Sequence, residues 1–513
     1  MHTIWIVATG LVALMRMAAG GASGQTASGP AAFVVTANQA QLFIDDEIID
    51  KQAGLKRTLH QPRKDFGGQR PIIAADAGTT LMAMGTIVRD PRLNKYVAFL
   101  RGHGADKYGY CRMTSADGMN WDEAGQDKLT PIHFDTNLEQ EPGARGGAGL
   151  DLFSCYYNPK DKVYPYQGWL YFANYGNNRE GIYYVRSGDG LTWERGPQVV
   201  NAYAGQGDTS CRVISQDGKT VYGPGDVTIF YPDPITGRFL GIFKFFTIQD
   251  VGEGNNLRSR AYLFLDHLDK PVDTNRIQRI ALLPAAADRN GDSRYDEYYA
   301  STAWRYESLW LGGLKIFHAK GDYPFSAAGC AFFKLVVSRD GLNWRKVQFN
   351  NDAGIPEVFI PNGPEGGSNG ANDGGYITEF SQGPLRIGDE LIYYYGCSSY
   401  GKNHEHGKRV TGGGLFRARL RIDGFVSVDG GTLTTKPLSF AGQDLYVNGV
   451  GPIIVEALKA DGTKLAETTI AGDSLRHRVT FDGRSLGQIA PEGTVRLGFN
   501  VRPGGQLYSF AVR

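Results

Sequence analysis

The stretch DLFSCYYNPKDKVYPYQGWLYFANYGNNREGIYYVRSGDGLTW (Asp151–Trp193) decides the fold of this chain. It begins with an acid before an aromatic segment, continues through two more segments of strand character, and closes with a turn of the form S-x-D-G-x-x-W. Short runs of aromatic and β-branched residues, separated by Gly, Asn and Asp, are typical of strands joined by tight turns. We therefore interpret this stretch as one structural unit made of short strands.

Parts of this unit recur along the chain. The segment DVTIFYPDP, which begins at Asp226, has the same spacing from acid to proline as DLFSCYYNP. The closing turn appears at Ser115–Trp121, Ser187–Trp193 and Ser338–Trp344. A period of roughly 75 residues that holds four short strands fits one blade of a β-propeller. The repeats predict an all-β chain with a five-bladed β-propeller over residues 32–429.

The recurring turn has a physical logic that predicts a structural role. An Asp side chain can accept the backbone N–H groups of a turn, and Gly supplies the positive φ angle. The large indole ring is suited to packing between neighbouring sheets. We therefore expect Trp121, Trp193 and Trp344 to pack blades together, and we expect the Asp residues of these turns to be structural.

The two ends of the chain differ in texture from the repeats. Residues 4–15 are mostly apolar and precede a run of small residues, so residues 1–31 are predicted to be a signal peptide and linker of a secreted or periplasmic protein, with no membrane span in the mature chain. The strand-like segment QLFIDDEIIDK (Gln41–Lys51) is expected to close the propeller ring. Residues 430–513 show short alternating strands, which predict a small C-terminal β-sandwich.

The composition limits the classes of partner. The chain is 42% hydrophobic and 21% charged and has a net charge of +1, so nothing favours nucleic acid or an anionic membrane surface. The five cysteines contain no C-x-x-C pair, and we predict no metal or cofactor. Calcium is an alternative for the oxygen-rich segment DRNGDSRYDE (Asp288–Glu297), but its spacing departs from D-x-[DN]-x-[DN]-G and favours a polar loop between blades.

The candidate catalytic residues are the acids that begin the first strand of each blade. In a propeller this strand lines the axis, so such residues point into a shared funnel. The repeat alignment puts Asp151 and Asp226 there, and it puts Glu307 before the apolar strand of YESLWLGGLKIF. Asp373 is a looser match in blade five, and Met84 stands at this place in blade one. The alternative for each acid is that it only caps a turn.

Other polar residues near the funnel are candidates for substrate binding. They are His103, Arg258, Arg260 and Tyr306, together with Asp373. An arginine suits an acidic sugar or a crowded carboxylate site. The plainer interpretation is a salt bridge for each arginine and a packing role for the histidine.

These features resemble a known group of proteins. The five blades, the acid-led strands, the S-x-D-G-x-x-W turns and the trailing β-sandwich are similar to glycoside hydrolase families 32 and 43. The segments QLFIDDEIID, YESLWLG and GDSLRHRVTFDG…LYSFAVR resemble bacterial secreted proteins with a family 32-like N-terminal domain. In families 32 and 43 the base or nucleophile is an Asp of the first blade, a second Asp supports it, and a Glu is the acid. The resemblance implies that Glu307 is the acid and that Asp151 or Asp226 is the supporting Asp, whereas Met84 departs from the first-blade pattern.

The predicted function is a secreted glycoside hydrolase that acts on an oligo- or polysaccharide. Glycosidic cleavage needs one protonated and one ionised carboxyl group. We expect Glu307, between Tyr306 and an apolar strand, to be the acid, because desolvation raises the pKa of a carboxyl group. One alternative is a polysaccharide lyase on a uronate-containing glycan, with His103 or Tyr306 as base and the Arg258/Arg260 pair on the uronate. The other is a non-catalytic glycan-binding propeller.

Overall fold

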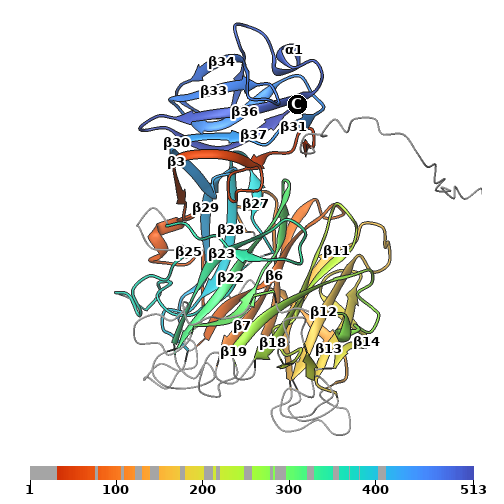
Figure 1. Ribbon diagram of the computed structural model, residues 1–513. Coiled ribbons are helices and arrows are strands. Elements are labelled where there is room, and N and C mark those ends of the chain that lie inside the picture. The colour runs from red at the N-terminus through yellow and green to blue at the C-terminus, as the bar shows by residue number, and fades with distance from the viewer. Residues whose placement is uncertain are drawn as a thin grey trace, which may run out of the picture.

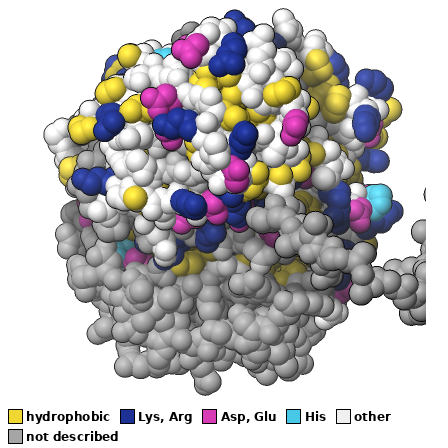
Figure 2. Space-filling view, turned by 45° about the horizontal axis from the view of Figure 1, so that its top comes forward, with side chains coloured by type: hydrophobic (Ala, Val, Ile, Leu, Met, Phe, Trp, Pro, Cys, Tyr) yellow, Lys and Arg dark blue, Asp and Glu magenta, His cyan; other side chains and the backbone are white. Residues whose placement is uncertain are grey.

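The chain forms a five-bladed β-propeller with a further β-sheet unit beside it (Figure 1). The computed structural model describes residues 32–75, 79–104, 109–121, 130–138, 149–173, 179–201, 212–214, 220–247, 257–277, 281–282, 296–319, 329–350, 358–368, 370–380, 382–402 and 412–513. Among these residues no helix is long and apolar enough to cross a membrane. On the face shown in Figure 2, basic and acidic side chains are interspersed, as the small net charge leads one to expect.

The first two blades are antiparallel sheets built from consecutive strands. Blade one has β6 (Thr79–Asp90), β7 (Lys95–Gly104), β8 (Gly109–Ser115) and β9 (Thr130–Pro131). Blade two has β11 (Gly149–Tyr157), β12 (Tyr166–Ala173), β13 (Gly181–Ser187) and β14 (Thr192–Asn201), and β10 (His133–Asp135) adds to β14 in parallel.

Blades three to five have an inner edge that consists of two strand segments. Blade three has β15 (Arg212–Ile214), the inner pair β16 (Thr220–Tyr222) and β17 (Ile229–Pro232), then β18 (Phe239–Thr247) and β19 (Leu257–Leu265). Blade four has the inner pair β20 (Asp296–Ser301) and β21 (Trp304–Tyr306), then β22 (Leu309–Ala319), β23 (Gly329–Ser338), β24 (Arg345–Lys346) and β25 (Val358–Ile360). Blade five has the inner pair β26 (Ile377–Phe380) and β27 (Leu385–Ile387), then β28 (Glu390–Cys397) and β29 (Gly414–Arg421). A short 3-10 helix, η5 (Thr274–Arg276), follows blade three.

The ring is closed by two short strands of the N-terminal region. These are β4 (Arg63–Lys64) and β5 (Ile73–Ala74), which pair with β29 on either side of the 3-10 helix η1 (Asp65–Gly68). The expectation that Gln41–Lys51 closes the ring is therefore wrong. That segment belongs to the other unit, because Phe43 packs against Phe499 and Phe510 in the core of the C-terminal sheet.

The C-terminal sheet has eleven strands and its own hydrophobic core. Three of its strands come from the N-terminal region: β1 (Phe33–Val35), β2 (Gln41–Leu42) and β3 (Ile49–Leu59). The others are β30 (Val426–Thr435), β31 (Leu438–Phe440), β32 (Leu445–Val450), β33 (Ile453–Leu458), β34 (Lys464–Ile470), β35 (Asp473–Val479), β36 (Thr494–Val501) and β37 (Gln506–Val512). The helix α1 (Leu486–Ile489) is a single turn with a Ser485 cap. Whether two layers of this sheet form a sandwich stays a prediction.

The three S-x-D-G-x-x-W turns have the predicted structure. In each turn the Asp carboxylate accepts the backbone N–H groups two and three residues later, and the Ser hydroxyl oxygen accepts the Gly N–H. The Gly φ angles are positive, between 74° and 79°. These bonds to backbone N–H groups lower the pKa of Asp117, so this carboxylate caps its turn.

Each tryptophan of these turns packs against the blade that precedes its own in the ring. Trp193 of blade two meets Phe99 of blade one, with ring centroids 5.8 Å apart. Trp344 of blade four stacks on Tyr262 of blade three at 4.8 Å. Trp121 of blade one meets Tyr394 of blade five at 5.5 Å. The prediction that these tryptophans pack blades together is confirmed.

Candidate functional site

The inner strands of the five blades run between two mouths of the propeller axis. At one mouth, here called the hairpin mouth, each inner strand turns into the second strand of its blade, as at residues 90–95, 157–166, 232–239, 306–309 and 387–390. At the other, the strand-start mouth, the inner strands begin. This division decides which of the predicted site residues lie together.

Asp151 lies near the start of the inner strand of blade two. Its carboxylate is paired with the buried Arg101 guanidinium of blade one, and its backbone carbonyl accepts the Tyr110 hydroxyl. The Asp151 side chain keeps 24% of its surface exposed, whereas that of Arg101 keeps 2%. A buried cation thus holds a partly exposed carboxylate at the boundary of two blades.

Asp226 occupies the corresponding place in blade three. It lies between β16 and β17, and its carboxylate is paired with the Lys244 ammonium, whose side chain is 6% exposed. The Asp226 side chain is 34% exposed. Burial works to raise the pKa of Asp226, but the charges of Lys244 and Arg258 outweigh it and hold the pKa well below its usual range. Asp226 is therefore an ionised carboxylate that faces solvent at this mouth.

A third pair joins blade three to blade four at the same mouth. Arg258 of β19 is paired with Glu297 of β20, and both side chains are largely buried. Burial acts to lower the pKa of Arg258, but Glu297 and its other neighbours more than offset this and raise it. Glu297 thus fixes the position of Arg258, and the charge of Arg258 lowers the pKa of Asp226 and of Tyr299.

Tyr299 is partly exposed at this mouth and is surrounded by cations. The Lys402 ammonium lies 3.3 Å from its hydroxyl oxygen, and Arg258 Cζ lies 4.4 Å from the centre of its ring. Lys315 Nζ lies 4.9 Å from the same ring centre and donates to the carbonyl oxygen of Thr378 in blade five. Burial works to raise the pKa of Tyr299, but Lys402, Arg258 and Lys315 outweigh it and lower the pKa to about 7.

The inner strands are irregular where these side chains lie. The pairing register shifts between Leu150 and Phe153 in β11, so that Asp151 lies in a bulge. A second shift, between Tyr298 and Ala300 in β20, places Tyr299 in a bulge as well. A bulge adds an unpaired residue and re-aims its side chain. Asp151 and Tyr299 are therefore presented by the same backbone device.

Glu307 does not lie with Asp151 and Asp226. It is in the two-residue turn between β21 and β22, where its φ angle is 52°. On β22, Glu297 lies opposite Phe317 near one end, and Tyr306, the neighbour of Glu307, lies opposite Leu309 at the other end. Most of the length of β22, about 25 Å at roughly 3.3 Å per residue, therefore separates Glu297 from Glu307. The prediction that Glu307 is the funnel acid therefore fails in geometry. Its error was to take β22 as the inner strand of blade four, whereas β20 and β21 form that edge.

The surroundings of Glu307 show what it does instead. One carboxylate oxygen accepts the Ala40 N–H at 2.9 Å, and the other lies 3.4 Å from Arg386 Nη1. Asn448 and Ser509 of the C-terminal sheet line the same small cavity. Burial raises the pKa of Glu307, as the sequence predicted, although at the junction of the two units and not in the funnel.

The predicted substrate-binding residues divide between the two mouths. Arg258 belongs to the strand-start mouth, but Arg260 is fully buried and donates to the carbonyl oxygens of Tyr298 and Val227, so it ties blade three to blade four. Tyr306 exchanges hydrogen bonds with Asp423 at 2.7 and 2.9 Å and is structural.

Of the remaining predicted residues, Asp373 is buried, and the side chains of two others are not among those that the structure describes. Asp373 is buried and is bonded to Lys64 Nζ at 2.5 Å and to the Tyr395 hydroxyl at 2.8 Å, so it fastens the ring-closing strand β4. The side chains of His103 and Met84 lie outside the described residues.

Sequence reasoning missed Tyr299, Lys244, Lys315 and Lys402. The signal for Tyr299 was present in YDEYYAS, an acid-led aromatic segment like DLFSCYY, but it follows DRNGDSR and was interpreted as part of a loop. Residues 288–295 lie outside the described part, and Asp296 pairs with His318 at 2.9 Å. Across the described residues, no cluster of three or more His, Cys, Asp or Glu side chains is arranged to hold a metal ion.

Comparisons with known proteins concern the fold alone. No family model matches the sequence, and no curated protein does. Among solved structures, the chain is similar to a thermostable family-43 glycoside hydrolase, with 12% identity over 70% of this chain and 96% of that one and a TM-score of 0.39. It is similar to an exo-1,5-α-L-arabinanase from a bovine ruminal metagenomic library, with 12% identity over 69% and 98% of the two chains and a TM-score of 0.37. A third similar structure, from work on the family 130 mannoside phosphorylases and hydrolases, has 14% identity over 71% and 94% and a TM-score of 0.40.

Proposed function

We propose that this chain is a secreted or periplasmic carbohydrate-active enzyme, a glycoside hydrolase whose active site is the strand-start mouth of the propeller. The observation that carries the proposal is the arrangement of Asp151, Asp226 and Tyr299. These three partly exposed side chains come from consecutive blades at one mouth. Each contacts a buried cation, which is Arg101 for Asp151, Lys244 for Asp226 and Arg258 for Tyr299. The apolar N-terminal run of residues 4–15 supports export.

A carboxylate and a tyrosine hydroxyl group at one mouth support hydrolysis by acid–base catalysis. The ionised Asp226 carboxylate takes a proton from water as the water oxygen bonds to the anomeric carbon. The Tyr299 hydroxyl gives its proton to the glycosidic oxygen as the bond from that oxygen to the anomeric carbon breaks. A group with a pKa near the working pH is suited to this donation, and the pKa of Tyr299 is about 7. Asp151 lies on the neighbouring blade, where it supports the positive charge that develops on the sugar ring.

A specific observation favours a second candidate, a polysaccharide lyase. Tyr299 is flanked by Arg258, Lys315 and Lys402, which would stabilise a tyrosinate base and the carboxylate of a uronate. In this reaction the base takes the proton beside the uronate carboxyl group, a double bond forms, and the glycosidic oxygen leaves with the bonding electrons. Tyr306, the base considered from sequence, is held by Asp423 and is not part of this mouth.

The experiment is an activity screen on neutral and uronate-containing oligosaccharides with two readouts. New reducing ends without ultraviolet absorbance support the hydrolase, and an unsaturated, absorbing product supports the lyase. For either reaction, Tyr299→Phe should lower turnover by about 10²–10⁴-fold. Full activity of Tyr299→Phe and of Asp226→Asn on a cleaved substrate would refute the site. Binding of a glycan at this mouth without any cleavage would leave the glycan-binding propeller as the answer.

A further inference from the structure

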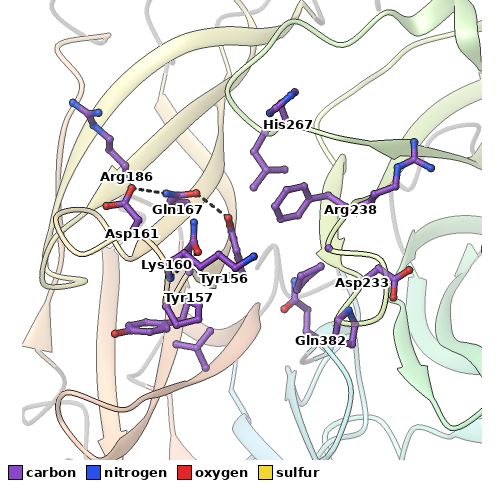
Figure 3. A pocket seen from close by; sticks show the side chains of 18 of the residues that line it. Tyr156, Tyr157, Lys160, Asp161, Gln167, Arg186, Asp233, Arg238, His267 and Gln382 are labelled. Carbon is purple, nitrogen blue, oxygen red and sulfur yellow. Dashed lines mark hydrogen bonds between the residues drawn. The ribbon is translucent and has the colours of Figure 1, made fainter. Parts of the chain in front are cut away.

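A large groove lies on the opposite side of the propeller from the proposed active site. It has a volume of about 1140 Å³ and is lined at the hairpin mouth by blades one, two and three and by Gln382 of blade five (Figure 3). Tyr156, Gln167 and Arg186 lie on one wall, and His267 lies on the other (Figure 3). Sites for drug-sized ligands have volumes of roughly 300–1,000 Å³, so this groove has room for several sugar rings.

The groove offers partly exposed aromatic rings beside polar atoms. Tyr156 and Tyr184, which lie on the same face of the blade-two sheet, are each half-buried and line the groove. The lining also includes the apolar residues Ile87, Val88, Phe239 and Leu268. A pyranose ring has an apolar C–H face and a rim of hydroxyl groups, and a tyrosine likewise joins an apolar ring to a polar tip. The walls thus match the two-sided character of a sugar.

The charges of the groove balance, which decides the class of ligand. Its cations are Arg89, Lys160, Arg186 and Arg238, and its carboxylates are Asp161, Asp233, Asp266 and Asp269. Several are already engaged, as in the pair of Arg238 and Asp266 at 2.7 Å. An anionic ligand therefore gains no net attraction here, in contrast to the strand-start mouth, where Tyr299 is surrounded by cations.

The groove is also held in shape by its own hydrogen bonds. The Tyr156 hydroxyl donates to Gln167 Oε1 at 2.8 Å, and Gln167 Nε2 donates to Asp161 at 3.0 Å (Figure 3). On the other wall, Asp233 is fully buried and accepts bonds from Ile235 N–H and the Thr236 hydroxyl. A preformed site loses less freedom when a ligand binds.

We propose that this groove is a carbohydrate-binding site for a neutral oligosaccharide, separate from the strand-start mouth. The tyrosines pack against sugar rings, and the charged side chains of the rim exchange hydrogen bonds with sugar hydroxyl groups. The proposal rests on the groove itself and stands whether or not the chain is a glycoside hydrolase. In an enzyme it would keep the protein on a glycan while the opposite mouth acts on a chain end or a second strand.

The test is a binding titration of the full chain by calorimetry and saturation-transfer NMR. The probes are neutral hexasaccharides of β-1,4-glucan, β-1,4-xylan, β-1,4-mannan and α-1,5-arabinan, with an oligogalacturonate hexamer as the acidic comparison. Asp226→Asn serves as the background, so that turnover at the other mouth does not consume the probe. Two groove variants are compared: Tyr184→Ala removes a half-buried ring of the lining, and His267→Trp fills the groove from an exposed position. Tyr446→Ala is the matched control, because it removes a half-buried tyrosine of the C-terminal sheet.

We expect at least one neutral hexasaccharide to bind, and both groove variants to weaken it by tenfold or more while Tyr446→Ala changes it less than twofold. If Tyr184→Ala fails to fold, His267→Trp decides alone. The proposal is overturned if none of the four neutral probes binds, if the oligogalacturonate binds more tightly than all of them, or if binding is unchanged in His267→Trp. Loss of turnover in Asp226→Asn tests the proposed function separately, because that residue is not in the groove.

Discussion

Trp193→Ala is expected to produce one of the largest stability losses of any single substitution in the propeller. The Trp193 side chain is fully buried and its ring is surrounded by aromatic rings of two blades. The centroid distances are 4.7 Å to Phe153, 5.8 Å to Phe99 and 6.2 Å to Tyr166. Truncation of a buried Trp to Ala costs about 3–5 kcal/mol when the surroundings cannot collapse into the cavity. Rings anchored in two separate sheets cannot collapse easily, so we expect the upper half of that range.

The assay is equilibrium denaturation in urea of the wild type, Trp193→Ala and Trp193→Phe. The shift in the transition midpoint, multiplied by the shared m-value, gives the change in the free energy of unfolding. Trp193→Phe keeps most of the ring volume and should cost less than half as much. A cost below about 1 kcal/mol for Trp193→Ala would refute the assignment of this ring to the interface between blades, since a solvent-facing tryptophan gives such values.

Three further predictions follow from named contacts. The folded-state pKa of Glu307 is raised above its usual 4.5, so the ionised form is disfavoured in the folded chain and stability should fall as pH rises through the folded-state pKa. Glu307→Gln should remove the contribution of this group to the slope of melting temperature against pH. A slope that is unchanged in Glu307→Gln would contradict the prediction. If Tyr299 is the proton donor, turnover should decline as pH rises past about 7, and the lyase would instead gain activity there, as a pH–rate profile shows. Lys64→Met should leave buried Asp373 without its cation and cost about 3–5 kcal/mol, measured by denaturation, whereas a neutral result would mean that β4 does not depend on this pair.

Much of the propeller could be predicted from sequence because its signals are local. The S-x-D-G-x-x-W turn contains its own capping groups, so Ser187, Asp189 and Gly190 specify their geometry without help from distant residues. The positions of Asp151 and Asp226 followed from the spacing of acid to proline, which the two inner strands share.

The errors arose where the decisive contacts are distant in sequence. Blade four was misassigned because its most apolar strand, β22, is the second strand and is covered on both faces, whereas its inner edge begins in a polar segment. The ring-closing strands β4 and β5 have two residues each and show no alternation that could reveal them. The cations behind the acids, Arg101 and Lys244, come from second strands, and only the three-dimensional packing brings them to the mouth.

The central claim is that chemistry takes place at the strand-start mouth and not at the junction that holds Glu307. The most direct test compares turnover of one cleaved oligosaccharide by the wild type, Asp226→Asn, Tyr299→Phe and Glu307→Gln, with melting curves to confirm folding. The account predicts a loss of about 10²–10⁴-fold for Asp226→Asn and for Tyr299→Phe, and less than a threefold change for Glu307→Gln. The opposite result, a large loss in Glu307→Gln with full activity in the other two variants, would contradict it.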